Sequence, residues 1–218
     1  MRRTLKGQEN DLKNRNRIFL LALFISANMA IAQNPFTEFK LGVFAPSGVE
    51  SGIFFGVNTG RMIDEAVSFS VAVDMYTNSS TQESEIFQGD EPTIVTEIEN
   101  STYYFPVLVK LNYERNLQSG MVIRGSGGIG YSFMWVNENN YLENINQTRY
   151  YSGLAWRMAG GIGIQISSSS NLFVDLAYNS STVSRDKGEN AQGLPTRTEI
   201  DMSGFAFRIG VSIFNLGF

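Results

Sequence analysis

The feature that most constrains this chain is a period of two in its apolar residues, which recurs in successive stretches between residues 37 and 213. In the stretch TEFKLGVFAP (37–46), Phe39 and Leu41 fall on one face of an extended chain, and Glu38 and Lys40 fall on the other. Strict alternation of this kind is typical of a β-strand whose two faces meet different surroundings. The pattern therefore predicts an all-β chain.

The same alternation predicts eight antiparallel strands, separated by turns and loops of unequal length. Short turns at one end of the strands and longer polar loops at the other are typical of an outer-membrane barrel. Each strand also has about the 9–11 residues that a tilted membrane strand needs. We predict strands near 37–46, 53–60, 66–76, 101–113, 123–133, 154–166, 171–179 and 204–213, short turns at 61–66, 114–120 and 167–171, and long loops at 77–101, 137–150 and 181–201.

Charged residues within these strands fall on one face only. An Arg or Lys that faced lipid at mid-strand would cost roughly 2–4 kcal/mol, so we expect the charged face to line the lumen. The interior of an eight-stranded barrel is just wide enough for side chains to fill. We predict a plugged lumen with a polar network of five cations and three anions: Glu38, Lys40, Asp74, Lys110, Arg124, Arg157, Asp175 and Arg208.

The opposite face of the strands is aliphatic and aromatic. A soluble barrel of the lipocalin type would have the reverse arrangement, with an apolar interior and a polar exterior. Aromatic residues near the strand ends are expected to form girdles at the two membrane interfaces: Tyr103, Tyr113, Tyr131, Trp135, Tyr151, Trp156 and Tyr178. The distribution favours a membrane barrel.

The N-terminal segment resembles an export signal in its order of residues. Arg15 and Arg17 precede an apolar run, and an Ala-Ile-Ala sequence ends at Ala32. This order predicts a cleaved signal peptide at residues 1–32, which leaves 33–218 as the barrel domain. An uncleaved anchor or a buried helix is the alternative. Removing residues 1–32 takes away six basic and two acidic residues, so the net charge changes from −4 to −8 and no basic patch for nucleic acid remains.

Residues 125–130, GSGGIG, match the G-x-G-x-x-G pattern of dinucleotide-binding loops. Such a loop must follow a strand and open a helix, so that the helix N-terminus meets the pyrophosphate. Here the glycines are followed by the strand-forming residues YSFMWV. We therefore assign the glycines to a strand. Gly128 and Gly130 would leave room for lumenal side chains, and Gly125 and Gly127 would ease curvature.

No catalytic centre, cofactor or metal is predicted. The chain has neither His nor Cys, which removes the commonest general base and the usual thiolate and imidazole metal ligands. The remaining enzymatic alternatives are a Ser-Lys dyad with Lys40 or Lys110 and a carboxylate pair, and a structural ion-pair network is the favoured interpretation. The carboxylates of residues 83–99 match no calcium-binding spacing, so we expect a solvated loop there.

Three segments carry a family resemblance. STYYFPVLVKLNY (101–113) resembles the aromatic–x–Pro–aliphatic–Lys strand of small outer-membrane β-barrel (porin-like, OmpA-barrel-like) proteins of Bacteroidetes-type bacteria. GSGGIGYSF and AGGIGIQI are similar to that family's paired glycine-rich strands. FAFRIGVSIFNLGF resembles the C-terminal signal read by the barrel-assembly machinery, with Phe214 or Phe218 as its terminal aromatic residue.

The resemblance implies an eight-stranded transmembrane β-barrel in the bacterial outer membrane. The implied partners are outer-membrane lipid and lipopolysaccharide, the barrel-assembly machinery during insertion, and an unknown extracellular ligand. We expect a structural or surface-interaction role through the loops. The alternative is a narrow porin-like channel for ions or small solutes.

Overall fold

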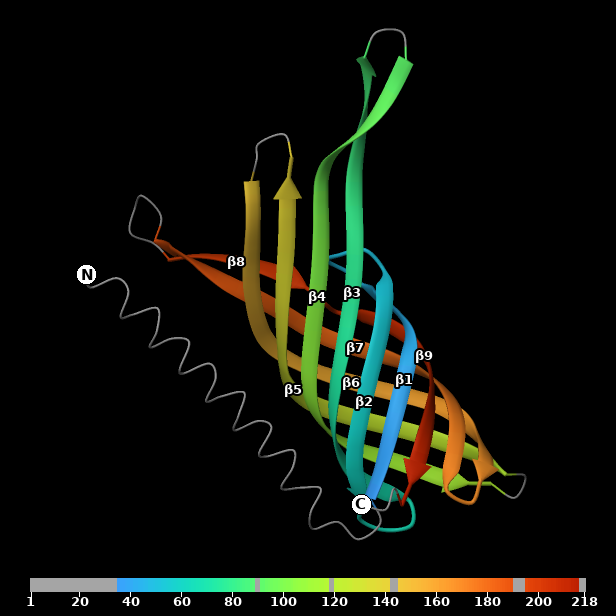
Figure 1. Ribbon diagram of the computed structural model, residues 1–218. Coiled ribbons are helices and arrows are strands. Elements are labelled where there is room, and N and C mark those ends of the chain that lie inside the picture. Colours follow the sequence, from blue (N-terminus) through green and yellow to red (C-terminus); the bar gives the residue numbers. More distant parts are fainter. Residues whose placement is uncertain (1–34, 89–90, 118–119, 142–144, 190–194, 216–218) are drawn as a thin grey trace, which may run out of the picture.

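The computed structural model describes residues 35–88, 91–117, 120–141, 145–189 and 195–215. They form an all-β structure of nine antiparallel strands (Figure 1). The strands are β1 (Pro35–Pro46), β2 (Gly52–Met62), β3 (Val67–Gln88), β4 (Glu91–Asn116), β5 (Met121–Asn140), β6 (Ile145–Ser167), β7 (Ser170–Glu189), β8 (Pro195–Asp201) and β9 (Gly204–Phe214).

Within these ranges, no helix is long and apolar enough to cross a membrane. The predicted signal peptide at residues 1–32 lies outside the described residues.

Eight of the nine strands close into a ring. Each of β1 to β6 pairs with the next strand in the chain, β9 pairs with β7, and β1 pairs with β9. The predicted eight-stranded antiparallel barrel is therefore confirmed. In the described pairings β8 lies outside the ring, because it pairs with the end of β7 alone. The first residues of β1 and the last residues of β9 lie at the same end of the barrel, which we call the turn end; the opposite end is the hairpin end (Figure 1).

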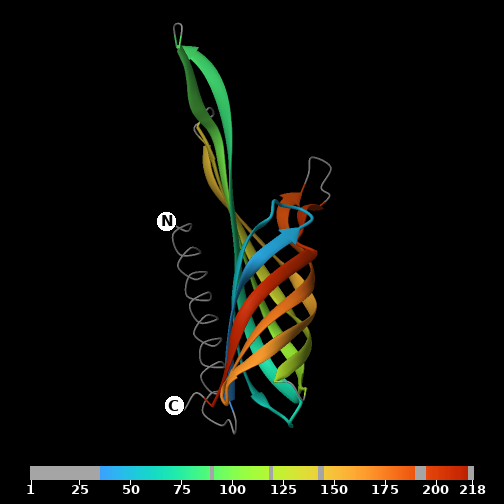
Figure 2. The same ribbon diagram turned by 90° about the vertical axis from the view of Figure 1, so that its right-hand side faces the viewer.

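The long loops predicted at 77–101, 137–150 and 181–201 are wrong, because most of their residues are strand. The ladder of β3 and β4 continues to the pair Gln88↔Glu91, and β8 arises from the third of these segments. Figure 2 shows these hairpins projecting well beyond the ring. Outside the barrel both faces of a strand meet water, so the ladder of hydrogen bonds persists while the apolar alternation that marks a strand disappears.

The two faces of the strands are divided as the alternation predicts. Outward side chains are apolar and exposed, as with Ile129 at 71% and Leu154 at 76%, whereas Glu38 and Arg208 are buried inside the ring. On the outward face, Trp135 stacks on Phe105 and Trp156 contacts Tyr178.

Tyr151 is the exception among the aromatic residues expected on the lipid face. It is buried inside the barrel, because it lies an even number of residues from Arg157 on β6 and shares its inward direction. At the C-terminal end, Phe214 closes β9 and packs near Phe36, while Phe218 lies outside the described residues.

The glycine-rich segment 125–130 is continuous strand, as the sequence predicts. A Cβ atom placed on Gly128 would come within 2.6 Å of Cγ of Lys110, and one on Gly130 would come within 2.9 Å of Cα of Leu108. A Cβ atom on Gly127 would meet nothing within 4 Å. Gly128 therefore leaves room for the lumenal side chain of Lys110, as predicted. Gly130 instead leaves room for the backbone of β4, and no contact requires a glycine at position 127.

Candidate functional site

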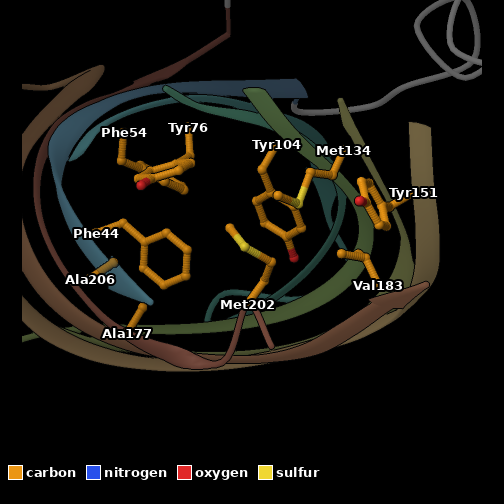
Figure 3. Packing of buried hydrophobic residues seen from close by; sticks show 10 residues of the cluster. All are labelled: Phe44, Phe54, Tyr76, Tyr104, Met134, Tyr151, Ala177, Val183, Met202 and Ala206. Atoms are coloured by element: carbon orange, nitrogen blue, oxygen red, sulfur yellow. The ribbon is translucent and has the colours of Figure 1, made fainter. Parts of the chain in front are cut away.

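An aromatic layer fills the hairpin end of the lumen. Rings from separate walls of the barrel converge there (Figure 3): Phe44 meets Tyr76 edge-on at 5.4 Å between centroids and stacks on Tyr104 at 6.4 Å. The Tyr76 hydroxyl donates to the backbone oxygen of Glu50, in the connection between β1 and β2. The cluster comprises Phe44, Phe54, Tyr76, Tyr104, Met134, Tyr151, Ala177, Val183, Met202 and Ala206.

This layer was not predicted from the sequence, because the inward face was expected to be polar throughout. The alternation of residues along the strands does place these rings on the inward face. Phe44 shares its face with Lys40, and Tyr76 shares its face with Asp74. Whether these aromatic side chains meet depends on how the strands are staggered around the barrel.

Below the aromatic layer, Arg157 links the ionic part of the lumen to the rings. Its guanidinium donates to the Asp74 carboxylate and, at 3.3 Å, to Oδ1 of Asn179. The Asn179 amide in turn donates to the Tyr104 hydroxyl at 3.2 Å. The Arg157 guanidinium also lies 5.2 Å from the Phe54 ring centre, within the range of a cation–π contact.

A second ion pair joins neighbouring strands. Arg208 on β9 donates from Nε and Nη2 to the two carboxylate oxygens of Asp175 on β7, at 2.6 and 2.8 Å. Both residues are buried. Such two-point pairing of a guanidinium with a carboxylate is the strongest form that an ion pair takes in proteins.

Glu38 is the centre of a third group. Its carboxylate accepts hydrogen bonds from Asn58 at 2.8 Å and from Ser212 at 3.1 Å, and it pairs with Lys40 at 3.0 Å. Arg124 pairs with the same carboxylate from across the lumen. The four donors satisfy a carboxylate that is only 1% exposed.

Arg124 has further partners of its own. It pairs with Glu114 at 2.9 Å, donates to Ser212 at 3.1 Å, and lies 3.5 Å above the ring centre of Phe173. Glu114 was not among the predicted lumenal residues, because it was assigned to the turn at 114–120. β4 in fact continues to Asn116, and Glu114 keeps the inward direction of Lys110.

The structure thus brings seven of the eight predicted charged residues into ion pairs inside the barrel, and the eighth, Lys110, is also buried there. None of the described carboxylates lies within 4.0 Å of the Lys110 ammonium.

A small cavity lies in the described part of the lumen. Lys110, Arg124 and Asp175 border a cavity of about 10 Å³. For the part of the chain that the structure describes, no group of three or more acidic side chains could hold a metal ion. Nor does Lys40 or Lys110 hydrogen-bond to any described serine, as a Ser-Lys dyad would require. The arrangement resembles a packed core, built from rings at one end and ion pairs at the other.

Comparison with known proteins gives both a family and structural neighbours. A family model described as "Outer membrane protein beta-barrel domain" matches residues 18–213. A major outer membrane protein from Thermus thermophilus superposes with a TM-score of 0.52 at 11% identity, over 83% of this chain and 99% of the other. Neisserial surface protein A gives 0.50 at 12% identity, over 83% and 95%. No curated protein matches. At these identities the two structures show the fold alone.

Proposed function

Because this chain belongs to the outer membrane protein β-barrel domain family, we propose that it is a sealed barrel of the bacterial outer membrane whose hairpins contact a partner outside the cell. The observation that carries the proposal is the pairing of β3 with β4, which continues to Gln88↔Glu91 although β2 leaves β3 at Thr77. The barrel then serves as an anchor for a projecting sheet.

The filled interior supports a sealed barrel. Tyr104 and its aromatic neighbours occupy one end of the lumen, and four of the five buried cations bind carboxylates at the other. An ion crossing the barrel would have to separate oppositely charged buried groups, which costs several kcal/mol for each pair.

The hairpins support a role in binding. Beyond Thr77 the β3 edge facing β2 has no described partner strand, and an open strand edge offers backbone groups to an incoming chain. Residues 83–99 contain six acidic residues and no Lys or Arg. We propose that this hairpin favours a partner with basic groups, because complementary charge speeds encounter and excludes wrong partners.

The outward face and the chain ends complete the proposal. The apolar outward face contacts lipid and lipopolysaccharide, the signal peptide at residues 1–32 directs export, and β9 is read by the barrel-assembly machinery during insertion. An origin in Bacteroidetes-type bacteria remains a prediction from the resemblance. We assign no catalytic role to the lumen.

Planar-bilayer recording tests the sealed barrel. Refolded protein should give no steady single-channel current, and steady currents would support the alternative, a narrow channel for ions or small solutes. Heat-modifiable migration on a gel serves as the control that the protein tested is folded.

Antibody labelling of intact cells tests the position of the hairpins. An epitope inserted between Gln88 and Glu91 should be labelled without permeabilisation, whereas the same epitope inserted at Asp64 should require it. The reverse result would contradict the proposed orientation.

A shortened hairpin tests the binding role. Ser80 and Asn100 face each other in the β3–β4 ladder, so residues 81–99 can be replaced by a two-residue Asn-Gly turn. Cells with this variant should bind less of a labelled oligolysine peptide than cells with the full barrel. Equal binding by both would contradict the proposed role of the acidic hairpin.

A further inference from the structure

Among the residues that the structure describes, the interior of the barrel contains one more positive side chain than negative ones. Its carboxylates are Glu38, Asp74, Glu114 and Asp175, and its cations are Lys40, Lys110, Arg124, Arg157 and Arg208. Every carboxylate has at least one of the other four cations as a direct partner. The extra positive charge is therefore that of Lys110.

Lys110 is poorly compensated where it lies. The residue is 3% exposed, and among the described residues it has no ion-pair partner. Two cations, Lys40 and Arg208, and two carboxylates, Glu38 and Asp74, act on it electrostatically. Each of these carboxylates already has an ion-pair partner of its own. A buried ammonium without a counter-charge is costly, because it gives up its hydration and receives nothing in exchange.

The same lysine borders the small cavity in the lumen. Arg124 and Asp175 complete its charged lining, and the rest of its wall consists of glycine, serine and alanine residues of β5 and β6. Its volume of about 10 Å³ is close to what one water-sized particle requires. Both oxygens of Asp175 are held by Arg208, so they do not neutralise Lys110.

We propose that this cavity binds one small monovalent anion of about the size of chloride, held between the Lys110 ammonium and the Arg124 guanidinium. The ion balances the charge of the lumen, which would otherwise carry one uncompensated positive charge. Larger anions such as phosphate do not fit the volume. The small wall residues on β5 and β6 provide the space, because a longer side chain there would fill the cavity.

Bromide diffraction tests the site directly. Crystals of the refolded barrel grown with sodium bromide in place of sodium chloride should show an anomalous scattering peak in contact with the Lys110 ammonium. A water molecule without anomalous signal at that position, or bromide bound only on the surface, would overturn the proposal.

Unfolding of the barrel in detergent micelles provides a second, independent test. At constant ionic strength, with gluconate as the replacement anion, chloride should stabilise the wild-type barrel. Above the dissociation constant, each tenfold rise in chloride should lower the unfolding equilibrium constant about tenfold.

Two variants make the unfolding test specific. Lys110→Met keeps a similar side-chain length without the charge and should abolish the chloride dependence. Arg197→Gln removes an exposed cation outside the barrel and should leave it unchanged. Equal chloride dependence in wild type and Lys110→Met would overturn the proposal, and if that variant does not fold, the bromide experiment on the wild-type protein still decides.

Discussion

Asp175 on β7 and Arg208 on β9 are directly opposite each other in the sheet, and their side chains form two hydrogen bonds on the inner face of the same rung. The pair is buried, with Arg208 0% exposed. Strand register brings these two groups together, so the ion pair depends on the pairing of β7 with β9 and not on contacts across the lumen.

Arg208→Met should destabilise the barrel by about 3–5 kcal/mol, because it leaves the Asp175 carboxylate buried without its guanidinium. The midpoint of urea unfolding in micelles measures the effect. The double variant Arg208→Met with Asp175→Leu should recover most of the loss, since an apolar pair of similar volume replaces a buried ion pair at little cost. A double variant as unstable as the single one would contradict this interpretation.

Arg157→Ala should be more destabilising than Arg124→Ala. Asp74 has Arg157 as its ion-pair partner, and its second oxygen, Oδ1, already has no hydrogen-bond partner, so removal of Arg157 should cost about 3–5 kcal/mol. When Arg124 is removed, Glu38 keeps Lys40, and Glu114, which loses its ion-pair partner, is 15% exposed and can be hydrated, so that cost should be roughly 1–3 kcal/mol. The same unfolding assay ranks the two, and unchanged midpoints for both would argue against a buried network.

Gly130→Ala should destabilise the barrel, whereas Gly127→Ala should not. A methyl group on Gly130 would meet the backbone of Val107 and Leu108 on β4, and one on Gly127 would point into open space. Overpacking of this kind costs typically about 1–3 kcal/mol, while removing a glycine from an unhindered strand position stabilises by roughly 0.5–1 kcal/mol. Similar midpoints for both variants would show that the wall adjusts to the added carbon.

The stability of the turn between β2 and β3 should decrease in acid, because it depends on the ionised carboxylate of Asp64. Its carboxylate accepts hydrogen bonds from the backbone N–H groups of Ala66 and Val67, each at 2.7 Å, and these hold the pKa of Asp64 below its ordinary value of 3.8. A group whose pKa is lowered by folding adds stability above its unfolded pKa and loses it as the pH falls through the folded value. Asp64 should therefore support the turn at neutral pH and lose this contribution as the pH falls from 3.8 through its lower pKa in the folded protein.

Carboxyl NMR of the barrel in micelles measures this titration. A midpoint for Asp64 below the ordinary value is expected, and one at or above it would contradict the hydrogen-bonded turn. Asp64→Asn should remove this contribution to the acid sensitivity of the turn.

Strand positions and the directions of side chains can be predicted from the sequence, because lipid and lumen select different residues at alternate positions. Lys40 and Leu41 illustrate this, since neighbours in the chain lie on opposite faces. The same reasoning fails outside the barrel. Ser79 and Ser101, for example, are hydrogen-bonded partners in a hairpin whose polar composition suggests a loop.

Contacts across the lumen could not be predicted. Arg124 and Glu38 are 86 residues apart in the chain, and their meeting depends on the tilt and stagger of the closed ring. Glu114 was missed for a simpler reason, because its position was assigned to a turn. It still belongs to β4, and its side chain points inward as that of Lys110 does. The unpaired state of Lys110 follows only once all the other partners are known.

The closing pair of strands, β1 and β9, forms a seam between segments from opposite ends of the described chain. Until β9 arrives, the growing sheet has two open edges, and the barrel can persist only after the seam is made. Arg124 reaches this seam from β5, on the far wall of the ring, and touches Glu38 on one side of it and Ser212 on the other. The Arg124 side chain thus crosses the lumen and binds both strands of the seam. Separation of β1 from β9 therefore requires that Arg124 first lose its contacts with Glu38 and Ser212.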